Sequence, residues 1–95
     1  LVAIDPRNAY YYRALGAIYW QQQEAQKALR QFTYAIRVAP HDVSSYVNRA
    51  EVFVASKQFE EARQDLHQAL SRARQEDQPL VKKANAMIQM IANHE

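Results

Sequence analysis

Residues 28–40 read ALRQFTYAIRVAP, and the pattern of this stretch recurs at a fixed distance along the chain. Ala28 returns 34 residues later as Ala62, and Pro40 lies the same distance after Pro6. Two further pairs at this interval are Tyr12 with Tyr46 and Ala35 with Ala69. This period is the length of a helix-turn-helix unit that stacks on copies of itself. The chain is therefore expected to form a row of paired helices with a concave surface.

Composition fits one small helical domain. Of the 95 residues, 48% are hydrophobic and 23% are charged, which allows a buried core. A single Gly and three Pro favour long helices with short connections. The net charge of +2 gives no basic face for nucleic acid, and no apolar run approaches the roughly 20 residues that span a membrane. Cysteine is absent, which excludes disulfides, and we expect a soluble intracellular protein.

The first repeat is expected to cover residues 9–42. Its first helix runs from about Asn8, the N-cap, to Gln21, and its second from about residue 24 to residue 38. Pro40 cannot continue the second helix. Gly16 falls where a small residue lets two helices approach closely. The inward-facing residues are Tyr12, Leu15, Gly16, Tyr19, Ala28, Phe32, Ala35 and Ile36.

A second repeat is expected over residues 43–76, followed by a capping helix within residues 77–95. The second repeat's helices span about 43–55, with Asp42 as N-cap, and about 59–74. Pro79 suits the first turn of the capping helix, which runs from about 79 to 93. Residues 1–8 are interpreted as the remnant of a preceding repeat, and the chain as a fragment of a longer protein. An exposed N-terminal face that includes Leu1, Ile4 and Tyr11 predicts self-association as a homodimer.

The pattern resembles the tetratricopeptide repeat family over nearly the whole chain. The matching residues are Tyr12, Leu15, Gly16, Tyr19, Ala28, Phe32, Ala35, Pro40, Tyr46, Ala50, Phe53, Phe59, Ala62 and Ala69. The resemblance implies an all-α fold, a solenoid of antiparallel helix-turn-helix units with a C-terminal capping helix. The sequence departs from the family at Arg49, where Leu is expected, and at Arg74, where Pro is expected. Gln23 and Lys57 stand where Gly often turns the helix pair.

The same resemblance implies a peptide-binding groove lined mainly by first helices. The implied site residues are Tyr10, Arg13, Ala17, Trp20, Val47, Asn48, Glu51 and Val54. Trp20 lies off the core stripe, so it either anchors a partner, worth about 2 kcal/mol or more, or packs on a neighbouring helix. A clamp for a C-terminal carboxylate is incomplete, because Ala17 stands where that clamp needs Asn.

No residue pattern indicates catalysis. His41, His67 and His94 are far apart, and none has the spacing of a metal site or a catalytic triad. No Gly-rich phosphate loop is present. We therefore expect no enzyme activity, no metal and no cofactor.

Finer details resemble the class II chaperones of bacterial type III secretion systems. The shared features are Tyr12, then Leu15-Gly16-Ala17, the stretch 31–35 (QFTYA), and Ala50-Glu51. This resemblance implies a bacterial cytoplasmic chaperone that holds an extended N-terminal segment of a translocator protein and keeps it soluble before export. Two alternatives stay open: a scaffold that joins folded proteins, and a co-chaperone of needle subunits.

Overall fold

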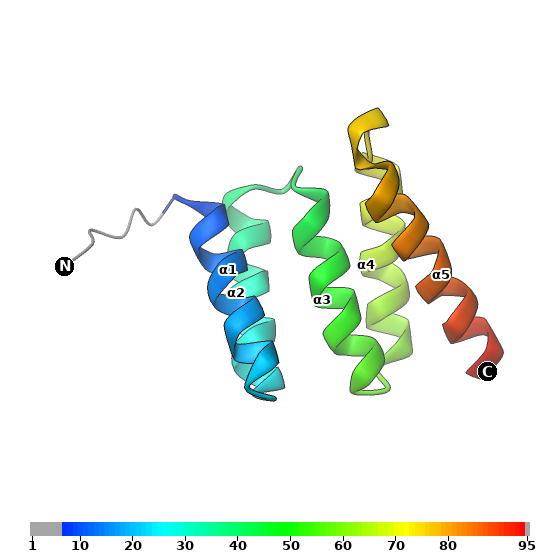
Figure 1. The fold of residues 1–95 in the computed structure, drawn as a ribbon, viewed down its shortest axis with the longest axis horizontal. Coiled ribbons are helices and arrows are strands. Elements are labelled where there is room, and N and C mark those ends of the chain that lie inside the picture. The colour runs from blue at the N-terminus through cyan, green and yellow to red at the C-terminus, as the bar shows by residue number, and fades with distance from the viewer. Residues whose placement is uncertain (1–6, 95) are drawn as a thin grey trace.

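The computed structural model describes residues 7–94, and in this range it contains five α-helices and one short 3-10 helix (Figure 1). The elements are α1 (Ala9–Gln21), α2 (Ala25–Val38), α3 (Val43–Ala55), α4 (Phe59–Arg72), η1 (Gln75–Asp77) and α5 (Gln78–His94). The predicted all-α fold is confirmed, and the starts of all five α-helices lie within one residue of the prediction. The proposed remnant at residues 1–8 lies, up to residue 6, outside the described residues.

The helices form two layers. Figure 1 shows α1, α3 and α5 on the near side, with α2 and α4 behind them. Each pair packs as a hairpin, α1 on α2 and α3 on α4, while α5 packs against both α3 and α4. The final helix therefore occupies the place that the first helix of a third unit would take. It packs on the second repeat and extends the layer of first helices.

Local side-chain chemistry sets where α1 and α3 begin. The Asn8 carboxamide oxygen accepts a hydrogen bond from the Tyr11 backbone N–H at 3.4 Å. The Asp42 carboxylate accepts from the Ser44 N–H at 3.2 Å. Both bonds satisfy backbone donors that the first helical turn leaves unpaired, as predicted for these two N-caps. At the other end of the second repeat, α4 stops two residues earlier than predicted, because Ala73 is extended (ψ 140°).

The turns inside both repeats have the same conformation although neither contains glycine. Gln23 (φ 63°) and Lys57 (φ 61°) both adopt the left-handed conformation. Each is followed by a residue whose N–H reaches back to the preceding helix, Glu24 to the Tyr19 carbonyl at 2.9 Å and Gln58 to the corresponding carbonyl at 2.8 Å. These bonds are those of a helix C-cap that normally ends on Gly. Gln23 and Lys57 therefore form this turn without glycine.

Two buried clusters hold the layers together. The larger joins α3, α4 and α5 around the fully buried Leu66. The smaller joins the two repeats, because Ala28 and Phe32 of α2 pack against Val52 of α3. Phe32 and Val52 are 1% and 0% exposed, so their side chains are shielded from solvent at the boundary between the repeats.

Gly16 is required by the close approach of α1 to α2. A β-carbon at Gly16 would lie 2.6 Å from Cε1 of the buried Phe32 ring, well inside van der Waals contact. One repeat later, Ala50 and Leu66 stand at these two positions, and both are fully buried. The two repeats therefore use different pairs at the same place, glycine with a large ring and alanine with a smaller side chain.

Arg49, the departure from the expected Leu, makes a buried ion pair. Its guanidinium donates to both carboxylate oxygens of Asp65 on α4, at 2.8 and 2.6 Å. It also donates to the Thr33 hydroxyl on α2 at 3.1 Å, and that hydroxyl donates to the Leu29 carbonyl. The Asp65 side chain is only 5% exposed. The network links three helices, and a bidentate Arg–carboxylate pair is the strongest form of such a contact.

The Gly16–Phe32 contact predicts non-additive substitutions. We expect Gly16→Ala to lower the free energy of unfolding by about 1 kcal/mol, because the clash outweighs the gain in helix propensity. Phe32→Leu alone should cost about 1–2 kcal/mol through lost packing. In the double variant the smaller Leu makes room for the new methyl group, so its cost should fall below the sum by about 1 kcal/mol. Urea unfolding measures all three, and a stabilised Gly16→Ala variant would contradict the close contact.

The Arg49 network predicts an asymmetric response. We expect Asp65→Ala to cost about 3 kcal/mol in urea unfolding, because it leaves the Arg49 charge largely buried without its carboxylate. Replacing both partners by leucine should recover most of that loss. Glu60→Ala is the control, since it removes an exposed ion pair with Arg63 on α4 and should change stability by less than about 0.5 kcal/mol. Equal effects of Asp65→Ala and Glu60→Ala would contradict the prediction.

Candidate functional site

An apolar cavity of about 430 Å³ opens between the C-terminal ends of α1 and α3 and the middle of α5. It is lined by Trp20, Glu51, Val54, Ala55, Lys83, Ala86, Met87 and Met90. Its walls come from the three helices of the near layer, so it lies on the face where paired-helix solenoids bind partners. We call it the apolar cavity below.

Trp20 has two roles in this arrangement. Its half-buried side chain packs against the cluster formed by Ala28, Phe32 and Val52. It also forms one wall of the apolar cavity. The two alternatives left open by the sequence are therefore compatible, because one part of the indole faces the core while another part borders the cavity. The core contacts hold the ring in place before any partner arrives.

The α5 side of the apolar cavity is built from small and flexible side chains. Met87 is 7% exposed and anchors α5 in the core, whereas Met90, one turn later, is 46% exposed. Ala86, directly before Met87, adds a small side chain to the same lining. Methionine is unbranched and polarizable, so it adapts to apolar groups of different shapes. This wall suits a surface that receives apolar side chains.

One ion pair lies at the rim of the apolar cavity. The Lys83 ammonium on α5 lies 3.2 Å from a carboxylate oxygen of Glu51 on α3, with both side chains about half exposed. Such an exposed pair contributes only about 0–1 kcal/mol to stability. Its effect on the site is electrostatic, because each charge neutralises the other beside the apolar wall.

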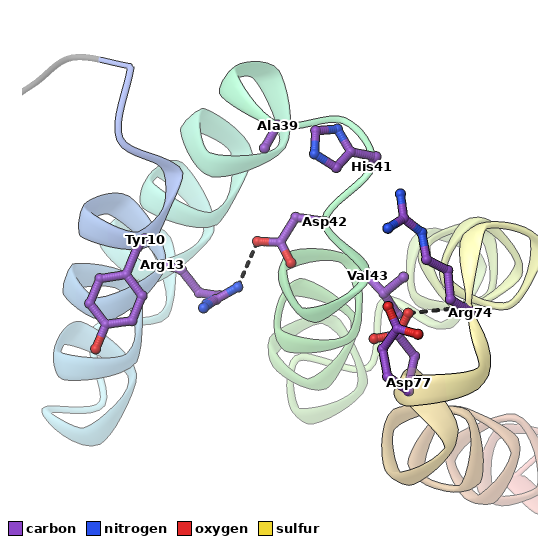
Figure 2. Close-up of a pocket in the computed structure, with 9 residues that line it drawn as sticks. Tyr10, Arg13, Ala39, His41, Asp42, Val43, Arg74 and Asp77 are labelled. Carbon is purple, nitrogen blue, oxygen red and sulfur yellow. Dashed lines mark hydrogen bonds and ion pairs between the residues drawn. The ribbon is translucent and has the colours of Figure 1, made fainter.

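A second, polar cavity of about 320 Å³ lies at the opposite end of the helices, where α1 and α3 begin (Figure 2). Its lining residues are Tyr10, Arg13, Ala39, His41, Asp42, Val43, Arg74, Glu76 and Asp77. Arg13 of α1 donates to the Asp42 carboxylate at 2.6 Å, and its guanidinium lies 5.5 Å from the centre of the Tyr10 ring. Asp42 also accepts from the Ser45 hydroxyl at 3.1 Å. The Arg13 charge is thus paired within the fold.

The structure separates the predicted site residues into groups. Trp20, Glu51 and Val54 line the apolar cavity, and Tyr10 and Arg13 line the polar cavity. Ala17 is exposed on α1 between these two groups, and Asn48 is half-buried on α3 outside both linings.

Val47 is a correction to the predicted groove. It is 0% exposed and belongs to the core cluster that includes Ala84 and Met87 of α5. Contrary to the expectation, Val47 does not face the groove, because α5 packs over this part of α3. A residue in this position contributes to the groove only by supporting it.

The sequence interpretation missed the contribution of α5. Lys83, Ala86, Met87 and Met90 were not assigned to the groove, because the final helix was treated only as a cap. Their spacing of three to four residues does mark one face of a helix. An exposed methionine on that face was the available signal. What the sequence could not supply was the packing angle that brings this face beside Trp20.

The described residues were also compared with the requirements of a metal site and of a membrane-spanning helix. Within residues 7–94, no three side chains of His, Cys, Asp or Glu come together in a way that could hold a metal ion. None of the helices in this range has the length and hydropathy to span a membrane.

Comparisons with known proteins agree with this architecture. The family model described as tetratricopeptide repeat matches residues 15–89. Among solved structures, the chain is similar to the tetratricopeptide repeat domain protein of Salinibacter ruber, with a TM-score of 0.84. That structure shares 18% sequence identity and is matched over 93% of this chain and 99% of its own. No curated protein matches the sequence.

Proposed function

This chain belongs to the tetratricopeptide repeat family, whose members are generally non-catalytic scaffolds, and we propose that it binds a segment of a partner protein in the apolar cavity. The observation that carries the proposal is the wall formed by Trp20, Val54 and Met90. About 25 cal/mol is gained for each Å² of apolar surface that a partner removes from water there.

Charge pairing supports an apolar partner. Arg13 pairs with Asp42, and Lys83 pairs with Glu51, so these lining charges compensate one another inside the groove. In the apolar cavity, a partner recognised by its charge would have to compete with the Lys83–Glu51 pair, because these two are the charged residues of its lining. Recognition through apolar side chains, with the rim supplying only weak polar contacts, requires no such change.

The partner that we propose is an extended apolar segment of a translocator protein of a bacterial type III secretion system. The chain would then act in the bacterial cytoplasm as a chaperone that keeps this segment soluble before export. Support comes from the sequence resemblance at residues 12–17 and 31–35, and from the apolar character of the cavity. Micromolar affinity, about −8 kcal/mol, would suppress aggregation and still allow release.

The proposal predicts a site-specific response of the single tryptophan. Overlapping peptides that cover the apolar segments of translocator proteins should change Trp20 fluorescence in a saturable way. We expect Met90→Glu to weaken the binding peptide by about tenfold or more, because it places a charge on the apolar wall. Met90 is 46% exposed, so the variant should fold.

Tyr34→Glu provides a matched control for this titration. Tyr34 is 39% exposed, and like Met90 it lies four residues before the end of its helix, but it borders neither cavity. We expect this variant to bind within about twofold of wild type. If a folded protein responds to no peptide, the groove proposal is contradicted and the scaffold function, through another surface, becomes the better explanation.

Binding should depend only weakly on salt. Because the two charged residues that line the apolar cavity pair with each other, we expect the dissociation constant of the bound peptide to change by less than about threefold between 0.05 and 0.5 M NaCl. Fluorescence titrations at several salt concentrations measure this directly. A steep loss of affinity with salt would indicate a charged partner that competes with Arg13–Asp42 or Lys83–Glu51.

A further inference from the structure

The solvent-facing side of α2 carries three basic side chains and one aromatic side chain in a single row. We call this row the basic stripe, and its members are Lys27, Arg30, Tyr34 and Arg37. They are separated by three, four and three residues, a spacing that places them on one face of a helix. All four are exposed, and α2 contains no Asp or Glu. The outer face of α2 is therefore positively charged.

Two of the three cations have no carboxylate partner. The Lys27 ammonium lies 3.1 Å from a carboxylate oxygen of Glu24, so this charge is compensated. In the part of the chain that the structure describes, Arg30 and Arg37 form no ion pair. The Arg37 guanidinium instead lies 6.0 Å from the centre of the Tyr34 ring, a cation–π distance. Along the helix, one aromatic ring is thus flanked by two guanidinium groups that are open to a partner.

The same four positions of α4 have a different chemistry. Their occupants, 34 residues later, are Glu61, Gln64, Gln68 and Ser71. All of them are exposed, as on α2, and α4 belongs to a repeat that has a complete helix pair in front of it. The exposure is therefore a property of these positions in the repeat. Neutral and acidic residues meet the solvent there on α4, so contact with water does not by itself require two arginines and a tyrosine.

The basic stripe lies away from both cavities. Figure 1 shows α2 in the layer behind α1, α3 and α5, which supply the walls of the apolar cavity. None of the four stripe residues lines either cavity. A partner on the stripe and a partner in the apolar cavity would not compete for the same residues.

We propose that the basic stripe is a docking surface for an acidic helix of a partner protein, one with two carboxylates seven residues apart and an apolar side chain between them. Arg30 and Arg37 are seven residues apart, which is about 10.5 Å along the axis at 1.5 Å per residue. A helix that lies along α2 has the same rise, so its two carboxylates meet the two guanidinium groups in register. Arginine binds a carboxylate through two parallel hydrogen bonds. The apolar side chain between the carboxylates covers the Tyr34 ring. This inference is independent of the groove function.

A phosphate-rich surface fits the stripe less well than an acidic helix. Clusters that hold a protein on anionic lipid contain about four to eight Lys or Arg residues. The stripe has three, and Lys27 is already paired with Glu24. Two open guanidinium groups match two carboxylates, and the aromatic ring between them matches an apolar side chain that a lipid headgroup does not offer. Membrane binding is therefore the competing outcome of the test.

The test uses the whole chain, labelled with ¹⁵N, and a designed helix as the probe. The probe is a capped alanine-based peptide of about 18 residues, long enough to form a helix, with two Glu seven residues apart and Leu at the third and fourth positions after the first Glu. We expect saturable shifts of the α2 amide signals at peptide concentrations up to about 1 mM, because exposed ion pairs are individually weak. Raising NaCl from 0.05 to 0.5 M should weaken this binding by about fivefold or more.

A rearranged peptide controls for unspecific attraction between charges. It has the same composition, but the second Glu follows the first by five residues, which places the two carboxylates about 140° apart around the helix. Only one of them then faces α2 at a time. We expect this peptide to bind at least about fivefold more weakly than the probe.

Two double variants of the chain locate the binding surface. Arg30→Gln with Arg37→Gln should weaken the probe by about tenfold or more, because it removes both open guanidinium groups. Arg63→Gln with Arg72→Gln is the matched control, since it lowers the net charge by the same two units on α4, and it should bind within about twofold of wild type. The Arg30/Arg37 variant should leave the translocator-peptide titration unchanged, and Met90→Glu should leave the acidic probe unchanged. The two proposals therefore fail separately.

Several outcomes would overturn the docking proposal. These are no shifts at about 1 mM, equal binding of the two peptides, or equal losses in the two double variants. Binding to vesicles of phosphatidylserine and phosphatidylcholine that depends on Arg30 and Arg37, without binding of the probe, would also overturn it. That result would assign the basic stripe to a membrane surface.

Discussion

The rest of the structure depends on one constraint. In each repeat, the second helix presents a row of apolar side chains that the following first helix has to cover. A single helix pair cannot cover Phe32 or Leu66 by itself, and in both repeats the next helix completes the cover. This requirement sets the order of the helices and forces α1, α3 and α5 onto one side. The groove is therefore a consequence of how the core is closed.

The final helix combines two functions that conflict chemically. As a cap, α5 has to bury Ala84, Met87 and Ile91 and present water-compatible residues elsewhere. As the third wall of the groove, it leaves Met90 nearly half exposed beside Trp20. A cap that only terminated the solenoid would gain nothing from an exposed methionine at this place. A partner bound as proposed would remove this exposed apolar surface from water.

Local features were predictable from the sequence because they depend on near neighbours. Asn8 and Asp42 were identified as N-caps, and Gly16 as a close-contact residue, from spacing alone. The position of Val47 was not, since its burial depends on a helix that begins about thirty residues later. The sequence identified Arg49 only as a departure from the expected Leu. Its carboxylate partner lies in another helix, at a position that repeat spacing alone does not relate to it.

Two ion pairs connect neighbouring helices along the open face. Arg13–Asp42 connects α1 to the start of α3, and Lys83–Glu51 connects α3 to α5. The first helices pack mainly on the second helices behind them. The two ion pairs lie on the opposite, open face, where they join α1 to α3 and α3 to α5.

Neither bridge contributes much stability by itself, because both are partly exposed to solvent. Their position matters more than their strength. The Lys83–Glu51 bridge lies on the rim of the apolar cavity, and the Arg13–Asp42 bridge lies in the polar one. A partner bound as proposed would contact the apolar wall and leave both ion pairs in place.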